Sequence, residues 1–186
     1  MFAYCGNNPV SRCDSTGFGW YEFWSDIRSW LTKEKKEAAN STDATATIGM
    51  TASGAFGVGG SVSWGITFDT KGNVGLAATG NIGGGFPSAG VGGFISFSNA
   101  PNIYKQSGLG VVVGASGGPG VVAVGAEYCM MIDQEEDTLY HGGTLSVSAG
   151  LYPTIAEVHG EVGYTSVVGF NVFDALIGVV DLLLMI

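Results

Sequence analysis

The chain has 186 residues and a net charge of −9, and 12% of its residues are charged, where roughly a quarter is usual for a soluble domain. Its length suits one domain with a short appendage. Seven Lys and Arg form no basic patch, which disfavours nucleic-acid binding by phosphate neutralisation. The 32 glycines show no G-X-Y period, which excludes collagen. Cys5, Cys13 and Cys129 include no C-x-x-C pair, so we expect no disulfide framework, no metal site and no cofactor.

The first 19 residues have the composition of a turn-rich segment, dominated by Asn, Pro, Ser, Asp and Gly. No positive region followed by an apolar run marks a secretory signal. Within this segment seven residues keep the spacing of Y-x-x-N-N-P followed by D-P-x-G and an apolar residue: Tyr4, Asn7, Asn8, Pro9, Asp14, Gly17 and Phe18. They resemble the closing signature of the RHS/YD-repeat family core, with Ser15 where that family usually has proline.

This resemblance implies a function for the rest of the chain. In that family the residues after the position of Phe18 are the variable C-terminal tip of a large secreted polymorphic protein. The core often cuts the chain just after that position, by an activity that needs upstream residues. The tip is usually a toxin delivered to a competitor cell or host. The implied partners are the upstream RHS core and a cognate immunity protein, and the type of toxic activity is not implied.

Residues 20–38 are predicted to form an amphipathic helix. Trp20, Trp24, Ile27 and Leu31 are spaced by four, three and four residues, which puts them on one helix face. Such an aromatic stripe suits docking onto the domain, and together with nearby cations it also suits a membrane interface. A linker follows, so the helix and linker cover residues 20–45.

Residues 46–170 are predicted to form an antiparallel, glycine-rich β domain. From residue 56 to 68 large apolar residues alternate with small ones, the period of a strand. Residues 69–73 predict a hairpin with Gly72 at positive φ. Further strands are expected near residues 74–82, 91–97, 109–113, 121–131, 145–151 and 155–168, with a break at residues 83–87. Short strands without intervening helices indicate a barrel or a sandwich.

The small face of these strands carries Gly, Ser and Ala where a soluble sheet carries charge. Three explanations remain open at this point: a covering second layer, the lumen of a small closed barrel, or strands whose large residues face lipid. The last explanation makes one set of residues candidates for membrane contact: Phe56, Val58, Val62, Trp64, Ile66 and Phe68.

Residues 171–186 are predicted to form an apolar helical tail, with Asn171 as its N-cap. Asp174 and Asp181 lie seven apart and share one face, which leaves the remainder of the helix for burial. At about 1.5 Å per residue the tail is too short to cross a bilayer of roughly 30 Å.

Catalytic motifs are weak throughout the chain. Residues 114–118 match G-x-S-x-G around Ser116, but that motif needs a helix after it, and a glycine-rich turn is the better interpretation. Glu157, His159 and Glu161 alternate and are expected on one strand face, where they suit acid–base chemistry or simple solvation. His141 is the second candidate histidine. Residues 133–137 are expected to form an acidic turn, and the charge run at residues 135–137 within it lacks a calcium-loop pattern.

The sequence therefore favours the effector module of a secreted RHS-type toxin, delivered to a target cell and active on membrane lipid as a pore. The alternative is a non-enzymatic β domain for binding or packing inside the parent protein. A hydrolase or metal-dependent enzyme that uses His159 or His141 is the third hypothesis, so an enzymatic activity is not expected.

Overall fold

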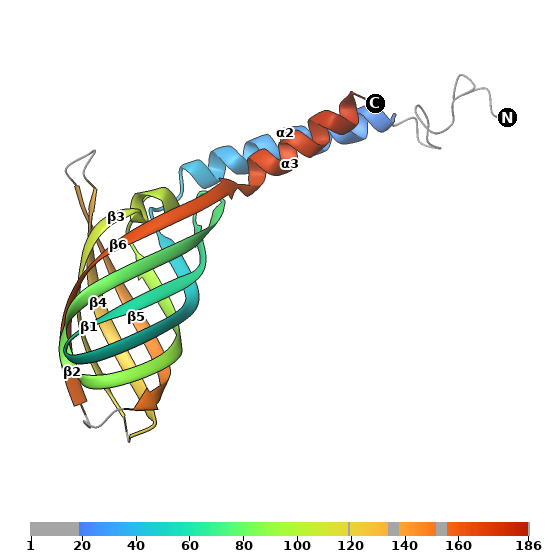
Figure 1. The fold of residues 1–186 in the computed structure, drawn as a ribbon. Helices are drawn as coiled ribbons and strands as arrows, with labels where there is room; N and C mark the ends of the chain where they lie inside the picture. The colour runs from blue at the N-terminus through green and yellow to red at the C-terminus, as the bar shows by residue number, and fades with distance from the viewer. Residues whose placement is uncertain (1–18, 119, 134–137, 152–155, 186) are drawn as a thin grey trace. The chain divides into compact units, whose positions relative to one another are not determined.

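A computed structural model describes residues 19–118, 120–133, 138–151 and 156–185 (Figure 1). The RHS-like residues 4–18, with Cys5 and Cys13, and the acidic residues 135–137 lie outside the described part. The chain divides into two compact units, one formed by residues 42–169 and the other by residues 1–41 with 170–186.

The larger unit is a closed antiparallel β-barrel, which confirms the expected fold class and selects the barrel over the sandwich. Its strands follow the order β1-β2-β5-β4-β3-β6, and pairing of β2 with β6 continues the ring. The bounds are β1 Thr45–Asp69, β2 Asn73–Ser98, β3 Gly108–Gly117, β4 Val122–Asp133, β5 Thr138–Leu151 and β6 Ala156–Asn171.

The long hairpin of β1 and β2 completes the barrel by bending back on itself (Figure 1). The register of β1 on β2 shifts between Ala55 and Gly57, and Gly57 has a φ of 79°. On either side of this bend, residues 45–55 and 57–69 of β1 approach each other, since Thr47 Oγ1 donates to Thr67 Oγ1 at 3.0 Å and Ser63 Oγ to Thr51 Oγ1 at 3.1 Å.

The predicted break of β2 was wrong, and the helix and linker predicted over residues 20–45 overlap the first residue of β1. β2 runs unbroken through residues 83–87, because β1 supplies ladder partners on both sides of its own bend. β1 already begins at Thr45. The predicted glycine-rich turn around Ser116 was also placed too early, since β3 continues to Gly117 and pairs with both β4 and β6.

The two ends of the barrel differ and are named here by their features. The bend end holds the bend of β1, the end of β3 and the start of β4, and Gly117 of β3 pairs there with Ala156, the first residue of β6. The η2 end holds the hairpin after Asp69 and the short 3₁₀ helix η2, Ile103–Gln106.

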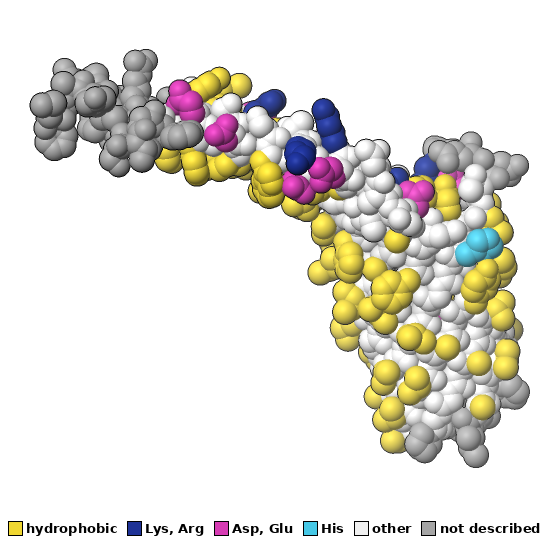
Figure 2. All heavy atoms as spheres, turned by 180° about the vertical axis from the view of Figure 1, so that it is seen from behind, with side chains coloured by type: hydrophobic (Ala, Val, Ile, Leu, Met, Phe, Trp, Pro, Cys, Tyr) yellow, Lys and Arg dark blue, Asp and Glu magenta, His cyan; other side chains and the backbone are white. Residues whose placement is uncertain are grey.

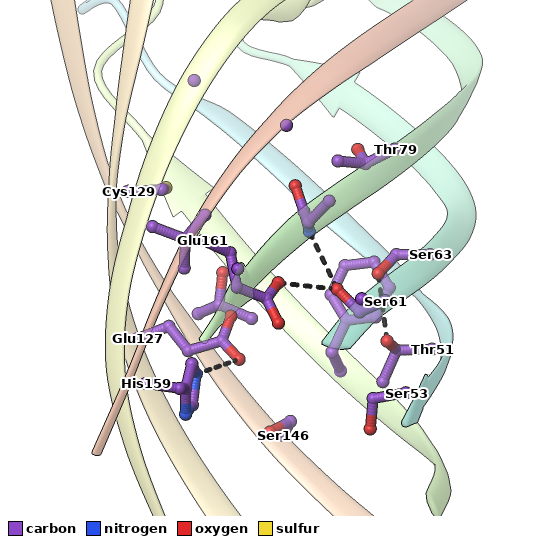
Figure 3. Close-up of a pocket in the computed structure, with 18 of the residues that line it drawn as sticks. Thr51, Ser53, Ser61, Ser63, Thr79, Glu127, Cys129, Ser146, His159 and Glu161 are labelled. Carbon is purple, nitrogen blue, oxygen red and sulfur yellow. Dashed lines mark hydrogen bonds and ion pairs between the residues drawn. The ribbon is translucent and has the colours of Figure 1, made fainter. Parts of the chain in front are cut away.

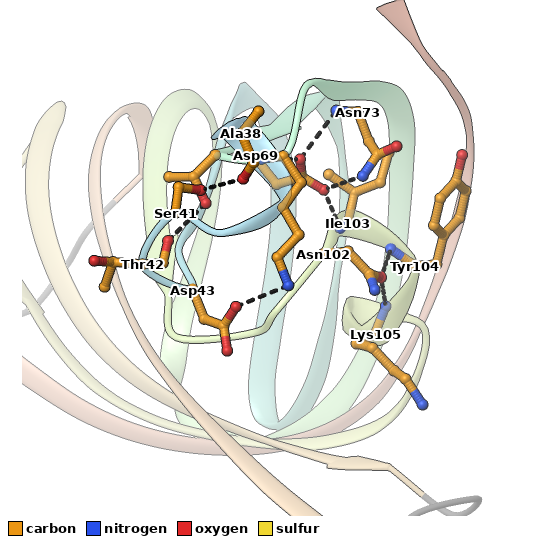
Figure 4. Close-up of polar contacts among 12 residues, drawn as sticks. Ala38, Ser41, Thr42, Asp43, Asp69, Asn73, Asn102, Ile103, Tyr104 and Lys105 are labelled. Atoms are coloured by element: carbon orange, nitrogen blue, oxygen red, sulfur yellow. Dashed lines mark hydrogen bonds and ion pairs between the residues drawn. The ribbon is translucent and has the colours of Figure 1, made fainter. Parts of the chain in front are cut away.

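Hydrogen bonds tie these two elements of the η2 end together (Figure 4). Asp69 Oδ2 accepts from the Ile103 backbone N–H at 3.0 Å and from Asn73 Nδ2 at 2.7 Å. Gly72 has a φ of 82°, as expected for this hairpin. Ile103 and Ala100 are fully buried, so this end has its own small apolar core.

The second unit contains helices α2, Trp20–Ala39, and α3, Val172–Leu184, which pack against each other. The Asn171 side chain caps α3 by accepting from the Asp174 backbone N–H at 3.2 Å. Arg28 pairs with Asp181, and Lys35 pairs with Asp174, so the two helices run antiparallel. The hydrogen bond and charge of Asp181 raise the pKa of the Arg28 guanidinium. None of the described helices combines the length and the apolar character needed to cross a membrane.

Candidate functional site

The outer surface of the barrel is apolar, which reverses the usual arrangement of a soluble barrel (Figure 2). The six residues that the sequence marked as candidates for lipid contact all point outwards, with Phe56 86% and Val58 75% exposed. The other strands contribute further exposed side chains, among them Leu76, Ile82, Val91, Phe97, Val113, Val124, Leu145, Val147, Leu151, Val158, Val162, Tyr164 and Val168.

The inner face of the barrel is mostly small and polar. Gly, Ser, Thr and Ala from β1, β2, β3, β5 and β6 line most of a lumen of about 200 Å³. Larger side chains also line it, among them Phe94 of β2, Val112 of β3, and Cys129 and Met131 of β4. The predominance of small side chains follows from backbone spacing, because a Cβ atom added to Gly49 would lie 2.1 Å from the Trp64 carbonyl oxygen. Only small side chains fit where strands of so narrow a barrel approach each other.

A cluster of ionisable side chains, called here the lumen cluster, projects into this space (Figure 3). β6 contributes Glu157, His159 and Glu161 from one face, and β4 contributes Glu127. His159 Nε2 lies 3.4 Å from Glu127 Oε1. Ser61 Oγ donates to Glu161 Oε2 at 2.8 Å, which links β6 to β1. No Lys or Arg lines the described part of the lumen, so the cluster makes this space acidic.

The lumen cluster does not form the catalytic arrangements considered from the sequence. Ser116 Oγ donates to Glu157 Oε1 at 2.8 Å, and His159 contacts Glu127, so the serine and the histidine have different partners. His141 lies on the opposite, outer face, where its Nδ1 is 2.6 Å from the Tyr128 hydroxyl. Among the described residues no set of three or more His, Cys, Asp or Glu is arranged to hold a metal ion.

Toward the η2 end the lumen is filled by a neutral hydrogen-bond network around Gln106. Gln106 is buried, and its Oε1 accepts from Thr67 Oγ1 at 3.0 Å. Its Nε2 donates to Thr45 and, at 3.4 Å, to Ser98 Oγ. This network obstructs one mouth of the lumen, so the cavity is narrow as well as acidic.

Sequence reasoning missed Glu127, which belongs to β4 and meets β6 only through strand pairing with β3 between them. One signal was present, because Glu127 is the single charged residue between Lys105 and Asp133. No family model and no curated protein matches this chain.

Proposed function

We propose that this chain is a membrane-active toxin module whose barrel inserts into the lipid bilayer of a target cell. One observation carries the membrane part of this proposal: the barrel is apolar outside and polar inside. The toxin part rests on the resemblance of residues 4–18 to the end of an RHS core. On that reading the chain is the effector end of a secreted protein, and its partners are the RHS core and a cognate immunity protein.

The exposed apolar surface is the first support for insertion. Apolar area in water is unfavourable by about 25 cal/mol per Å², and contiguous patches above a few hundred Å² mark membrane or protein contacts. Exposed large side chains occur on all six strands. Lipid acyl chains surround a barrel on all sides, whereas a protein partner usually covers one side, so the distribution favours lipid.

The backbone is the second support. In hydrocarbon every backbone N–H and C=O needs an internal partner, which helices and closed barrels provide. Strand length also agrees, because a membrane-crossing strand needs about 9–11 residues and the shortest strand, β3, has 10.

The lumen limits what such a barrel conducts. The Gln106 network narrows one mouth of a lumen of about 200 Å³, so we propose that the barrel conducts only water and small ions and not dye-sized molecules. Its three carboxylates, Glu127, Glu157 and Glu161, favour cations over anions. The proposed toxic effect is therefore loss of membrane potential without leakage of larger solutes.

The proposal is tested by adding the full chain to lipid vesicles that hold a potassium diffusion potential and an entrapped dye. We expect the protein to float with the vesicles and to collapse the potential while the dye stays inside. Val162, which is 57% exposed near the middle of β6, provides the variant. Val162→Lys is expected to lower vesicle binding roughly 30-fold or more, and Val162→Leu is the matched apolar control.

Insertion would be contradicted if the parent chain stays in solution, or if the Val162→Lys variant binds vesicles as well as the parent chain does. That result would favour the alternative, a β domain whose apolar exterior is covered by the parent protein. Vesicle binding without loss of potential would support insertion and reject conduction. Toxicity in cells that is abolished by His159→Ala or His141→Ala, with an intact membrane potential, would instead support the enzyme hypothesis.

A further inference from the structure

The charged residues of the barrel lie either in its lumen or at one of its two ends. This distribution bears on which end enters a membrane first. All charged side chains among described residues 42–169 belong to one of two groups. Glu127, Glu157 and Glu161 line the lumen. The others lie at the η2 end: Asp43, Asp69, Lys71, Lys105 and Asp133.

Interactions between these residues confirm that they share the η2 end. Lys71 Nζ lies 2.9 Å from Asp43 Oδ1, and Lys105 Nζ lies 2.7 Å from Asp133 Oδ2. Asp69 is bonded to the backbone of Ile103, the first residue of η2. In Figure 2 the charged side chains of the visible barrel face likewise gather at one end.

The bend end has the opposite character. In the sequence, the bend of β1, the segment that joins β3 to β4 and the end of β5 contain no Asp, Glu, Lys or Arg over residues 53–60, 117–124 and 145–151. Glu157 directly follows Ala156 and is the charged residue nearest this end, with its side chain in the lumen. Large apolar side chains are exposed there, at 86% for Phe56, 72% for Leu151 and 65% for Val121, but also toward the η2 end, at 74% for Val168 and 67% for Leu76. The two ends therefore differ in charge and not in apolar exposure.

Chain connectivity distinguishes the ends in the same sense. β1 begins and β6 ends at the η2 end, since Thr45 pairs with Ser98 and Thr165 pairs with Gly108. The flanking segments of the chain are thus attached to the η2 end. The end of the barrel that enters a bilayer first must carry its turns across the hydrocarbon core. Each charged residue in those turns raises the free-energy barrier to crossing.

From these observations we infer that the barrel enters a bilayer with the bend end first, so that the bend end reaches the far side and the η2 end stays on the side of entry. This inference rests on the proposed function and adds a direction to it. The partner surface is the hydrocarbon core of a lipid bilayer, which the uncharged turns of the bend end can cross.

Single cysteines test the direction in the full chain, after Cys5, Cys13 and Cys129 are replaced by serine. Val121→Cys marks the bend end and Tyr104→Cys, in the exposed part of η2, marks the other end. The protein is added to preformed neutral-lipid vesicles, and then a membrane-impermeant maleimide is added outside. We expect Tyr104→Cys to react at once and Val121→Cys to react only after detergent is added. Both react before vesicles are present.

A matched pair of charges tests the cause. Val121→Lys is expected to slow insertion by roughly tenfold or more, and Tyr104→Lys to change it less than twofold, although both add the same charge. The inference would be overturned if the maleimide reacts with Val121→Cys from outside while Tyr104→Cys is protected. Equal insertion rates for the two lysine variants would also overturn it. Failure of the parent chain to float with vesicles would instead reject the proposed function, so the two failures are distinguishable.

Discussion

At the scale of single residues, glycine sets how closely the strands approach. Gly49 and Gly65 face each other where β1 folds back, and a Cβ atom on either would lie within 2.4 Å of a backbone oxygen. Gly80 of β2 differs, because nothing lies within 4 Å of the position its Cβ would take. The glycines of this chain are therefore not equivalent, and only some of them are required by packing.

This difference predicts opposite results for two alanine substitutions. Gly49→Ala should lower the free energy of unfolding by about 1–3 kcal/mol, because backbone must shift to admit the methyl group. Gly80→Ala should be neutral or slightly stabilising, since it restricts the unfolded chain and meets no neighbour. Urea unfolding in detergent micelles measures both. Equal losses for the two variants would show that close strand approach at Gly49 is not what the fold requires.

The second residue-scale prediction concerns the lumen cluster. Glu127→Ala removes the side chain that faces His159 Nε2 and is expected to reduce stability by about 1–3 kcal/mol, because a partly buried polar group loses its partner. Glu127→Gln should lose less, since its amide oxygen still accepts a hydrogen bond. The same unfolding experiment compares them. An alanine variant as stable as the parent chain would show that this contact contributes nothing.

At the scale of elements, the packing of α2 on α3 combines a small apolar contact with exposed ion pairs. Leu31 and Val180 are each only 4% exposed, whereas the side chains of Arg28 and Asp181 remain 48% and 40% exposed. Exposed ion pairs contribute about 0–1 kcal/mol, and a buried leucine contributes several times more. The apolar contact therefore holds the pair together, while the ion pairs set its antiparallel register.

Two variants separate these contributions. Leu31→Ala should lower the local free energy of unfolding of α2, obtained from the hydrogen exchange of its amides, by about 2–4 kcal/mol. Asp181→Asn should lower the same free energy by less than about 1 kcal/mol. Hydrogen exchange of the full chain measures both in one experiment, with barrel amides as an internal reference. A larger loss for Asp181→Asn than for Leu31→Ala would contradict the assignment of the apolar contact as the dominant one.

At the scale of the whole molecule, the inverted barrel links structure to the proposed toxicity. Expression of the full chain in bacteria, directed to the cytoplasm or the periplasm, should arrest growth with rapid depolarisation. The arrest should vanish in Val162→Lys and persist in Val162→Leu, because only the charge opposes insertion. A potential-sensitive dye in living cells gives the measurement. Arrest without depolarisation would contradict conduction, and no effect in either compartment would reject the autonomous toxin.

Most of the fold follows from local patterns in the chain. Alternation of large and small residues predicts the strands, and the spacing of aromatic residues predicts α2. Glu157, His159 and Glu161 are likewise expected on one face, since they are two residues apart along a strand. Glu127 and Ser61 escape such reasoning, because they join the cluster only through strand pairing. The continuity of β2 through its glycines could not be predicted from local patterns either, because it depends on pairing with β1.

Alternation with a period of two defines two faces of a strand, but it does not say which face is inside. The sequence determines the two faces, and only the tertiary structure decides which one faces the lumen. Composition and alternation alone establish a nearly uncharged β domain with one large and one small face. Only closure of the barrel assigns the small face to the lumen. The physical reason is that inward side chains converge as a sheet curves: glycine and serine fit most easily inside so narrow a ring, and most of the large apolar side chains point outwards.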